Sequence, residues 1–274
     1  MSVSARLRPR KSLGQHWLTD GRYLRRIAEA ADIGKHDTVI EAGAGTGLLT
    51  ERLIPRAARL IAVEIDPALC ERLRERFGEH PNVVVVQDDV LAVSPEELLR
   101  RGGGRLPYVV IGNLPYFIGT AIIRRFLESS VKPRWIIATL QAEVAENMAA
   151  SPGRMRYLSV ATQLFADARI IFQIPAKAFR PAPKVASAVV RLDVLDGLAV
   201  EVDDTTAFLK LVQAGFAAPR KRLRNSLAIG LRVQPAESEA IIGGARLDSA
   251  RRPAELSLGD WRALYFAYRA AVSP

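Results

Sequence analysis

A glycine-rich turn near the start of the chain has the composition of a ligand-binding loop. The segment EAGAGTG, residues 41–47, follows an apolar β-branched run and precedes a helical pattern. Glycine lets the backbone turn tightly and approach a ligand that a Cβ atom would exclude. The spacing is G-x-G-x-G, which differs from the G-x-G-x-x-G of dinucleotide sites. We expect Gly43 and Gly45 to contact a ligand.

Two carboxylates follow the next two predicted strands. Glu64 ends the second strand, where a carboxylate could accept both hydrogen bonds of a ribose diol. Asp89 follows the third strand, where it could accept a hydrogen bond from an adenine amine. Either acid alone could be a helix N-cap or a solvated loop residue. In this order after the glycine-rich turn, they resemble the S-adenosylmethionine site of Rossmann-like methyltransferases.

The sequence NLPY, from Asn113 to Tyr116, could hold an exocyclic ring amine. Such an amine is a poor nucleophile, because its lone pair is delocalised into the ring. The Asn113 side-chain oxygen and the Leu114 carbonyl, before Pro115, could accept its two N–H groups and aim the lone pair at a methyl donor. Tyr116 offers a stacking face, worth ~1–3 kcal/mol per base, to a base flipped out of its stack. NLPY could equally be an Asn-initiated turn. After Asp89, it resembles the catalytic loop of amino-directed adenine methyltransferases.

Alternating strands and helices must position these residues. The nearly all-apolar runs are typical of strands buried on both faces of a parallel sheet. We therefore predict an α/β fold: a Rossmann-like methyltransferase sheet, mostly parallel, with antiparallel edge strands at 169–174 and 185–192. The other predicted strands are 37–41, 59–64, 82–87, 108–111 and 135–140, and the helices between them are 46–56, 67–77, 95–101 and 120–129.

The pattern changes after residue 193 and predicts a second, smaller domain. No convincing strand follows, and GG and Pro breaks separate short helical patterns. We expect a methyltransferase domain with a basic N-terminal arm over 1–195 and a helical RNA-binding domain over 200–274. The helices predicted there are 207–216, 221–231, 237–242 and 258–270.

Composition narrows the class of protein. Of the 274 residues, 49% are apolar and 25% charged, which excludes disorder, collagen and coiled coil as overall descriptions. The net charge of +10 suits a nucleic acid or an anionic membrane surface. The lone cysteine, Cys70, cannot form an intrachain disulfide. With no secretory signal or long apolar run, we expect a cytoplasmic protein, and no spacing of residues predicts a metal site.

Four further stretches resemble one enzyme family. KSLGQHWL (11–18) looks like the K-x-F-G-Q-N-F-L opening of the ribosomal RNA adenine dimethylases, and LQAEV (140–144) resembles their L-Q-K-E-V segment. FRPAPKVAS (179–187) is similar to their F-x-P-x-P-K-V-x-S signature. FAAPRKRLRNSL (216–227) looks like the F-x-x-R-R-K-x-L-R-N-x-L helix of the small-subunit branch. The resemblance spans roughly residues 10–270.

The resemblance implies an enzyme that dimethylates the N6 amines of two adjacent adenosines near the 3′ end of small-subunit ribosomal RNA, during ribosome assembly. It implies that S-adenosylmethionine is the cofactor, that Gly43 lies against its methionine part, and that Phe179 offers a second stacking face. His16 and Trp17 depart from the family's Asn and Phe. The cofactor-binding residues expected are Gln15, His16, Leu18, Gly43, Gly45, Glu64, Ile65, Asp89, Val90 and Asn113.

The excess positive charge lies in two short stretches. Residues 1–26 carry seven Lys and Arg against one Asp, four further basic residues lie within 220–224, and the rest of the chain is neutral. We predict two phosphate-binding patches, against the alternative of a diffusely basic surface. The residues expected in them are Arg8, Arg10, Lys11, Arg220, Lys221, Arg222 and Arg224.

Three other functions share some of these features. A large-subunit adenine methylase of the macrolide-resistance type shares the chemistry, but the Leu in NLPY and the 220–227 helix favour the small-subunit branch. A non-catalytic RNA-binding assembly factor is disfavoured by the intact Glu64, Asp89 and Asn113. The glycine spacing and NLPY argue against a nicotinamide dehydrogenase. The expected partner is ribosomal RNA in an immature small subunit, bound by a monomer without membrane or metal.

Overall fold

The structure, a computed structural model, describes residues 15–272. The chain forms two compact units, one of Met1–Ala145 with Arg169–Val194 and one of Glu146–Ala168 with Leu195–Pro274. The sequence-based division at 195–200 lies near the last of the three boundaries between the units, after Val194. The segment 146–168, which that division assigned to the first domain, packs instead with the C-terminal helices. The functional roles of the two domains remain predictions.

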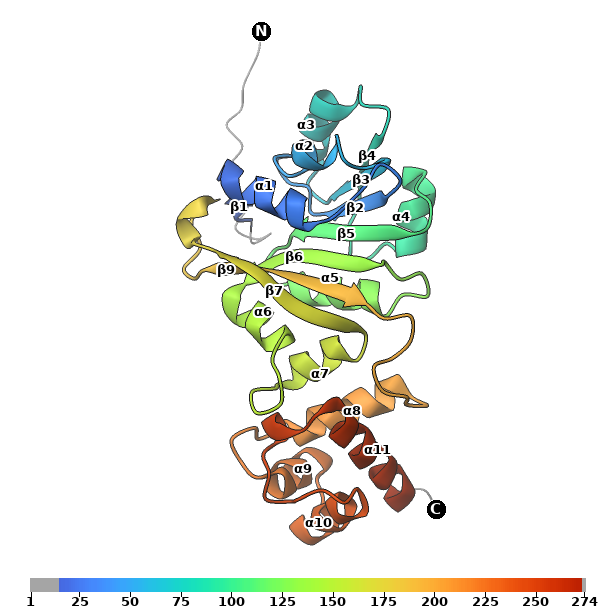
Figure 1. Ribbon diagram of the computed structural model, residues 1–274, viewed down its shortest axis with the longest axis vertical. Coiled ribbons are helices and arrows are strands. Elements are labelled where there is room, and N and C mark those ends of the chain that lie inside the picture. Colours follow the sequence, from blue (N-terminus) through green and yellow to red (C-terminus); the bar gives the residue numbers. More distant parts are fainter. Residues whose placement is uncertain (1–14, 273–274) are drawn as a thin grey trace. The chain divides into compact units, whose positions relative to one another are not determined.

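The first unit contains a seven-stranded sheet in the order β4-β3-β2-β5-β6-β9-β7 (Figure 1). Neighbouring strands from β4 to β6 run parallel, whereas β9 runs antiparallel to β6. The predicted α/β fold, mostly parallel with an antiparallel edge, is thereby confirmed. The strands are β2 (Thr38–Ala42), β3 (Arg59–Glu64), β4 (Val83–Gln87), β5 (Tyr108–Asn113), β6 (Trp135–Gln141), β7 (Ala166–Ile174) and β9 (Ser187–Val194).

Helices cover both faces of this sheet because alternate strand residues face opposite ways. Leu60 of β3 belongs to one core cluster with Leu24 and Phe77 of the helices on one face. The next residue, Ile61, faces the other way and meets the end of helix α4 (Pro95–Gly102) at Gly102, where a Cβ would lie 2.4 Å from the Ile61 side chain. The helices of this unit are α1 (Gly21–Ala30), α2 (Thr50–Leu53), α3 (Pro67–Phe77), α4 (Pro95–Gly102), α5 (Gly119–Leu127) and the start of α6 (Ala142–Met148).

The first predicted helix is much shorter than expected. Its pattern predicted 46–56, but α2 begins only at Thr50. The reason is the backbone of the preceding turn, where Gly43, Gly45 and Gly47 all have positive φ, at 73°, 57° and 79°. Consecutive helical residues need negative φ, so the helix cannot start until this turn is complete. The glycine-rich segment thus forms the loop that precedes α2 and is not part of the helix.

A two-stranded pairing joins two segments that are distant in the sequence. Strand β1 (Trp17–Leu18) pairs antiparallel with β8 (Phe179–Arg180), so that Leu18 lies opposite Phe179. The Thr19 N–H also donates to the Ala178 carbonyl at 2.9 Å. The family-like opening segment and the F-x-P-x-P segment are therefore neighbours in space, a pairing that the sequence analysis did not predict.

The second unit is helical, as predicted for 200–274. Its helices α8 (Thr205–Gly215) and α9 (Leu223–Leu231) pack so closely that a Cβ at Gly230 would lie 2.1 Å from the Ala214 carbonyl oxygen. The rings of Phe208 and Tyr265 meet edge to face, 5.7 Å apart, in its core. Within residues 15–272, no helix has the length and apolar character needed to cross a membrane. The helices are α7 (Tyr157–Gln163), α8 (Thr205–Gly215), α9 (Leu223–Leu231), α10 (Pro235–Gly244) and α11 (Leu258–Val272).

Candidate active site

A cavity of about 300 Å³ opens at the carboxyl ends of β2, β3, β4 and β5. This is the edge at which open α/β sheets bind ligands. All ten residues predicted to bind the cofactor line it, together with the whole NLPY segment. The lining residues that the sequence predicted are Gln15, His16, Leu18, Gly43, Gly45, Glu64, Ile65, Asp89, Val90, Asn113, Leu114, Pro115 and Tyr116.

Glu64 is a buried carboxylate held by backbone donors. Its Oε2 accepts a hydrogen bond from the Gly45 N–H at 2.8 Å, and its Oε1 accepts from the N–H groups of Ile65 and Asp66, each at 3.0 Å. Burial raises the pKa of Glu64, and these backbone hydrogen bonds oppose the rise. These contacts fix the end of β3 to the glycine-rich turn. One carboxylate therefore holds together two segments that line the cavity.

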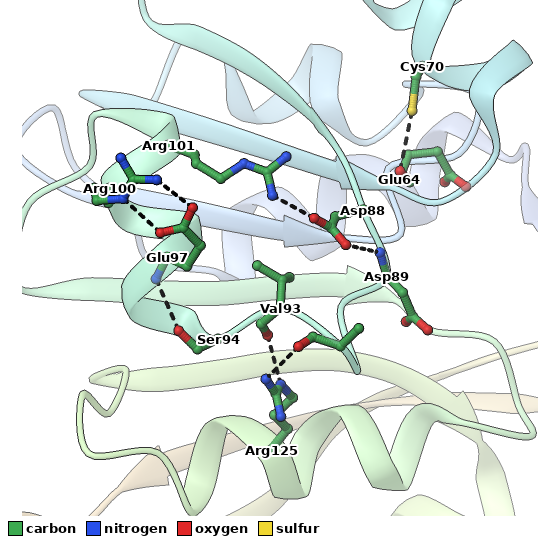
Figure 2. Close-up of polar contacts among 11 residues, drawn as sticks. Glu64, Cys70, Asp88, Asp89, Val93, Ser94, Glu97, Arg100, Arg101 and Arg125 are labelled. Atoms are coloured by element: carbon green, nitrogen blue, oxygen red, sulfur yellow. Dashed lines mark hydrogen bonds and ion pairs between the residues drawn. The ribbon is translucent and has the colours of Figure 1, made fainter.

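The two acids of the loop after β4 face different neighbours (Figure 2). Asp88 forms an ion pair with Arg101 of α4 at 2.5 Å, and the guanidinium lowers the pKa of Asp88. Figure 2 shows the Asp89 carboxylate turned away from that pair. Its Oδ1 accepts the Leu91 N–H at 2.9 Å. Asp88 therefore secures the loop, and Asp89 is the better placed of the two to meet a ligand.

The glycine-rich turn leaves room where a side chain would stand. A Cβ built at Gly43 meets no atom within 4 Å, so this backbone faces open space on the cavity wall. Its N–H donates to the Val63 carbonyl at 2.9 Å, which anchors the turn to β3. A cradle of this kind, with acceptors at Glu64 and Asp89, fits the methionine, ribose and adenine parts of S-adenosylmethionine.

Cys70 lies behind this wall as a small core residue. It is buried on α3, and its Sγ donates to the Glu64 backbone carbonyl at 3.3 Å (Figure 2). Burial raises its pKa to about 11. The thiol is therefore protonated at neutral pH and takes no part in the chemistry that we consider below.

The Asn113 amide is oriented by the opening segment of the chain. Its Nδ2 donates to the His16 backbone carbonyl at 3.0 Å. The amide group is planar, so fixing the nitrogen also fixes the direction of the oxygen, the acceptor that the sequence analysis assigned to a substrate amine. The bond uses the His16 backbone, so the departure from the family's Asn at this position leaves it intact.

Tyr116 is held at its ring and at its hydroxyl. The imidazole of His16 stacks on the Tyr116 ring, with centroids 5.5 Å apart and planes 21° apart. The Tyr116 hydroxyl shares a hydrogen bond of 2.6 Å with the Ser187 hydroxyl. His16 Nδ1 is also 2.8 Å from the Pro181 carbonyl oxygen. The F-x-P-x-P-K-V-x-S segment thus supports the NLPY loop at two points: Pro181 holds it through His16, and Ser187 holds it directly.

Phe179 does not join the cavity. Its side chain is fully buried in the core cluster beneath the β1–β8 pair, opposite Leu18. A ring in that position has no face exposed to a base, so the structure contradicts the expected stacking role. Strand pairing is the physical reason, because residue 179 faces the core in the antiparallel register. The signature aromatic therefore holds the opening segment over the site.

Glu41 is a lining residue that the sequence analysis left without a role. Its side chain is buried, and burial raises its pKa to about 8. No described residue gives its Oε2 a hydrogen bond. A strand residue between apolar neighbours was the only signal for this burial in the sequence. At neutral pH, the group is mostly a neutral acid beside the carboxylate of Glu64.

The predicted RNA-binding residues are only partly described. Arg220, Lys221 and Arg222 precede α9 and are exposed. Arg224, inside α9, pairs with Glu239 at 3.2 Å, which offsets part of its charge. Arg8, Arg10 and Lys11 lie outside the described residues. Among residues 15–272, no cluster of three His, Cys, Asp or Glu side chains could hold a metal ion.

Known proteins resemble the chain over nearly all of its length. It is 40% identical over 262 residues to the ribosomal RNA small subunit methyltransferase A of Dehalococcoides mccartyi, covering 96% of this chain and 89% of that protein. The crystal structure of the 23S ribosomal RNA methyltransferase ErmE matches with a TM-score of 0.70 and 30% identity, over 92% of this chain and 98% of that one. A dimethyladenosine transferase from Plasmodium falciparum has the same fold, with a TM-score of 0.75 at 22% identity, over 93% and 98%.

The family comparison agrees with these relatives. The sequence model described as ribosomal RNA adenine dimethylase matches residues 6–258. That match covers both of the motif groups that converge on the cavity, the opening segment and the glycine-rich turn with NLPY. The chain belongs to the ribosomal RNA adenine dimethylase family.

Proposed function

We propose that this protein transfers methyl groups from S-adenosylmethionine to the N6 amines of two adjacent adenosines near the 3′ end of small-subunit ribosomal RNA. One observation carries the proposal most directly. The Asn113 amide, fixed by the His16 carbonyl, lies on the wall of a cavity that also contains Glu64 and Asp89. The family and its fold are those of S-adenosylmethionine-dependent methyltransferases.

The cofactor would be held by the residues that form the inner wall. Gly43 offers open backbone to the methionine part, Glu64 offers oxygens to the ribose hydroxyls, and Asp89 offers an acceptor to the adenine amine. Ile65, exposed on the cavity wall, supplies an apolar surface for the adenine ring. The bound cofactor supplies an electrophilic methyl group on a sulfonium. These residues fix where that group faces the NLPY loop.

The NLPY loop would hold the amine of the target adenosine. The Asn113 Oδ1 and the Leu114 carbonyl accept its two N–H groups, which draws the nitrogen toward tetrahedral geometry and directs its lone pair. The Tyr116 ring supports the flipped base by stacking. Catalysis then comes mainly from positioning and preorganised dipoles, without a strong general base.

Two features favour the small-subunit substrate over the large-subunit one. The relative at 40% identity is named for the small subunit, whereas the large-subunit methyltransferase ErmE is 30% identical. The segment 216–227 also resembles the basic segment of the small-subunit branch, and Arg220, Lys221 and Arg222 are exposed just before α9. We propose that these residues bind RNA phosphates and that the protein acts as a cytoplasmic monomer, without metal, on an immature small subunit.

Methyl transfer to purified ribosomal particles tests the proposal. Labelled S-adenosylmethionine would be incubated with immature small subunits and, separately, with large-subunit RNA, and the modified adenosines would be mapped by primer extension. We expect two adjacent dimethyladenosines in the small-subunit RNA. Modification of the large-subunit RNA alone would favour the macrolide-resistance type, and binding without transfer would favour a non-catalytic assembly factor.

A further inference from the structure

Phe117 is an exposed aromatic residue at the edge of the cavity. It follows Tyr116 directly, lines the cavity, and leaves 61% of its surface exposed. Eight large apolar residues are exposed in the described part of the chain, and Phe117 and Ile65 are the two of them that line this cavity. Isolated exposed apolar residues are common on proteins, so the position beside the substrate loop is what makes Phe117 informative.

The turn that carries Phe117 is well held. The N–H groups of Ile118 and Gly119 both donate to the Pro115 carbonyl, at 3.2 Å and 2.9 Å. Gly119 begins α5, and a Cβ there would lie 2.6 Å from Leu140, so the helix start fits tightly on the sheet. The ring of Phe117 therefore projects from a fixed backbone.

The ring has no aromatic partner within residues 15–272. Phe266, the other exposed phenylalanine, packs its ring against Tyr265 at 5.2 Å and beneath the guanidinium of Arg262 at 5.1 Å. No comparable ring or cation contact involves Phe117 among the described residues. No ring or cation of residues 15–272 therefore covers its apolar surface, which is 61% exposed.

We propose that Phe117 is a positioning residue that stacks with the adenosine next to the target. This inference rests on the proposed function, which requires two adjacent bases to be methylated in turn. Adjacent bases are joined through one phosphodiester, and Phe117 follows Tyr116 directly, so the neighbour of a base on Tyr116 can reach the Phe117 ring. An aromatic ring suits any base, and a ring on a fixed turn loses little conformational freedom on binding.

If Phe117 stacks with the neighbouring base, removing its ring should impair the reaction with RNA and leave cofactor binding unchanged. Removing the ring in Phe117→Ala should lower kcat/KM for RNA by about 5- to 150-fold, the range that corresponds to ~1–3 kcal/mol of stacking. The affinity for S-adenosylhomocysteine, measured by calorimetry, should stay within about twofold of the wild type. Phe117→Tyr keeps the stacking face and should retain activity. Leu106→Ala removes an equally exposed side chain (62%) outside the cavity lining and serves as the control.

Fluorescence tests the contact without requiring turnover. An RNA hairpin with 2-aminopurine next to the target adenosine would be titrated with protein saturated with S-adenosylhomocysteine. We expect the wild type, Phe117→Tyr and Leu106→Ala to alter the fluorescence through stacking, and Phe117→Ala to lose that change. If Phe117→Ala has wild-type activity and gives the same fluorescence change as the wild type, the role of Phe117 alone is overturned. A wild type that fails to methylate immature small subunits would instead contradict the proposed function, and this inference with it.

Discussion

The Asn113 amide nitrogen donates to the His16 backbone carbonyl at 3.0 Å, a bond that links residues 97 positions apart. It joins the end of a central parallel strand to the segment that pairs with β8. The orientation of the proposed acceptor oxygen thus depends on the opening segment being in place. This relationship gives the opening segment a role in placing the amine as well as in covering the cofactor.

Replacing Asn113 with Ala should abolish the proposed acceptor while sparing the cavity. We expect kcat to fall by at least about 10²- to 10³-fold, the loss typical of removing one preorganised group. The cofactor keeps its contacts with the other nine expected binding residues, so its affinity should fall far less. Single-turnover methylation and calorimetry measure the two quantities. His16→Asn is the matched control for the backbone bond, because the carbonyl is retained. It removes the imidazole that stacks on Tyr116 but should lose far less activity than Asn113→Ala. Near-normal activity in Asn113→Ala would refute the catalytic role.

Replacing Glu64 with Ala should weaken cofactor binding and also destabilise the fold. The buried N–H groups of Gly45, Ile65 and Asp66 would lose their acceptor, and each unpaired buried donor costs about 1–3 kcal/mol. Glu64→Gln keeps one acceptor oxygen, so it should lose less stability than Glu64→Ala while still losing affinity for the cofactor. Calorimetry with S-adenosylhomocysteine and thermal unfolding separate the effects. An unchanged dissociation constant in a folded Glu64→Ala protein would show that the ribose does not bind there.

The stability of the free protein should fall as pH rises from about 5 to 8. Burial raises the pKa of Glu41 from 4.5 to about 8, so between these values the native state holds a proton that the unfolded state has lost. For this one proton, the loss approaches about 1.4 kcal/mol per pH unit at most. The raised pKa of Glu64 adds a dependence of the same sign.

Glu41→Gln isolates the contribution of this one acid. The variant keeps the shape of the side chain and cannot ionise, so its free energy of unfolding should depend less on pH. Urea unfolding at pH 5.5, 6.5 and 7.5 measures the two slopes. Parallel slopes for the wild type and the variant would mean that Glu41 titrates near its ordinary value.

The hydrogen bond between Tyr116 and Ser187 should position the stacking ring. We expect Tyr116→Phe and Ser187→Ala each to reduce kcat several-fold without changing cofactor affinity, because each removes the same 2.6 Å bond. The double variant should be little worse than either single one, because residues that share one interaction are not additive. Fully additive losses of activation free energy in this double-mutant cycle would exclude a shared role.

The exposed basic residues before α9 should bind RNA phosphates. Lys221→Glu should weaken RNA binding and flatten its dependence on salt, because each lost phosphate contact reduces the salt slope by about one. Arg224→Glu should have a smaller effect, since Glu239 already pairs with that arginine. Lys210→Glu, at another exposed lysine of the same unit, is the control. Binding measured between 50 and 200 mM salt should distinguish them, and an equal response of Lys210 and Lys221 would support a diffusely basic surface.

Periodic and local signals made much of the first unit predictable. The apolar runs that became β2 to β6 could be recognised because burial on both faces demands nearly continuous apolar sequence. Glu64 and Asp89 could be placed together because parallel strands end at one edge of the sheet. The three glycines marked the turn correctly, although their positive φ angles shortened the helix that was expected to follow.

Long-range contacts account for what the sequence analysis missed. Strands of two residues, such as β1 and β8, have no periodicity to detect, and their pairing is what buries Phe179. The burial of Glu41 and the ion pair of Arg224 with Glu239 likewise depend on partners from other elements. The Asn113–His16 bond belongs to the same class, because its acceptor is a backbone carbonyl that no residue type identifies.

The most direct test of the account is methyl transfer by the wild type and Asn113→Ala to the same immature small subunits. Mass spectrometry of the digested RNA would count the methyl groups on each adenosine. The account predicts two adjacent N6,N6-dimethyladenosines with the wild type and none with Asn113→Ala within the same reaction time, although both proteins bind S-adenosylhomocysteine. Equal methylation by the two proteins, or none by the wild type, would contradict it.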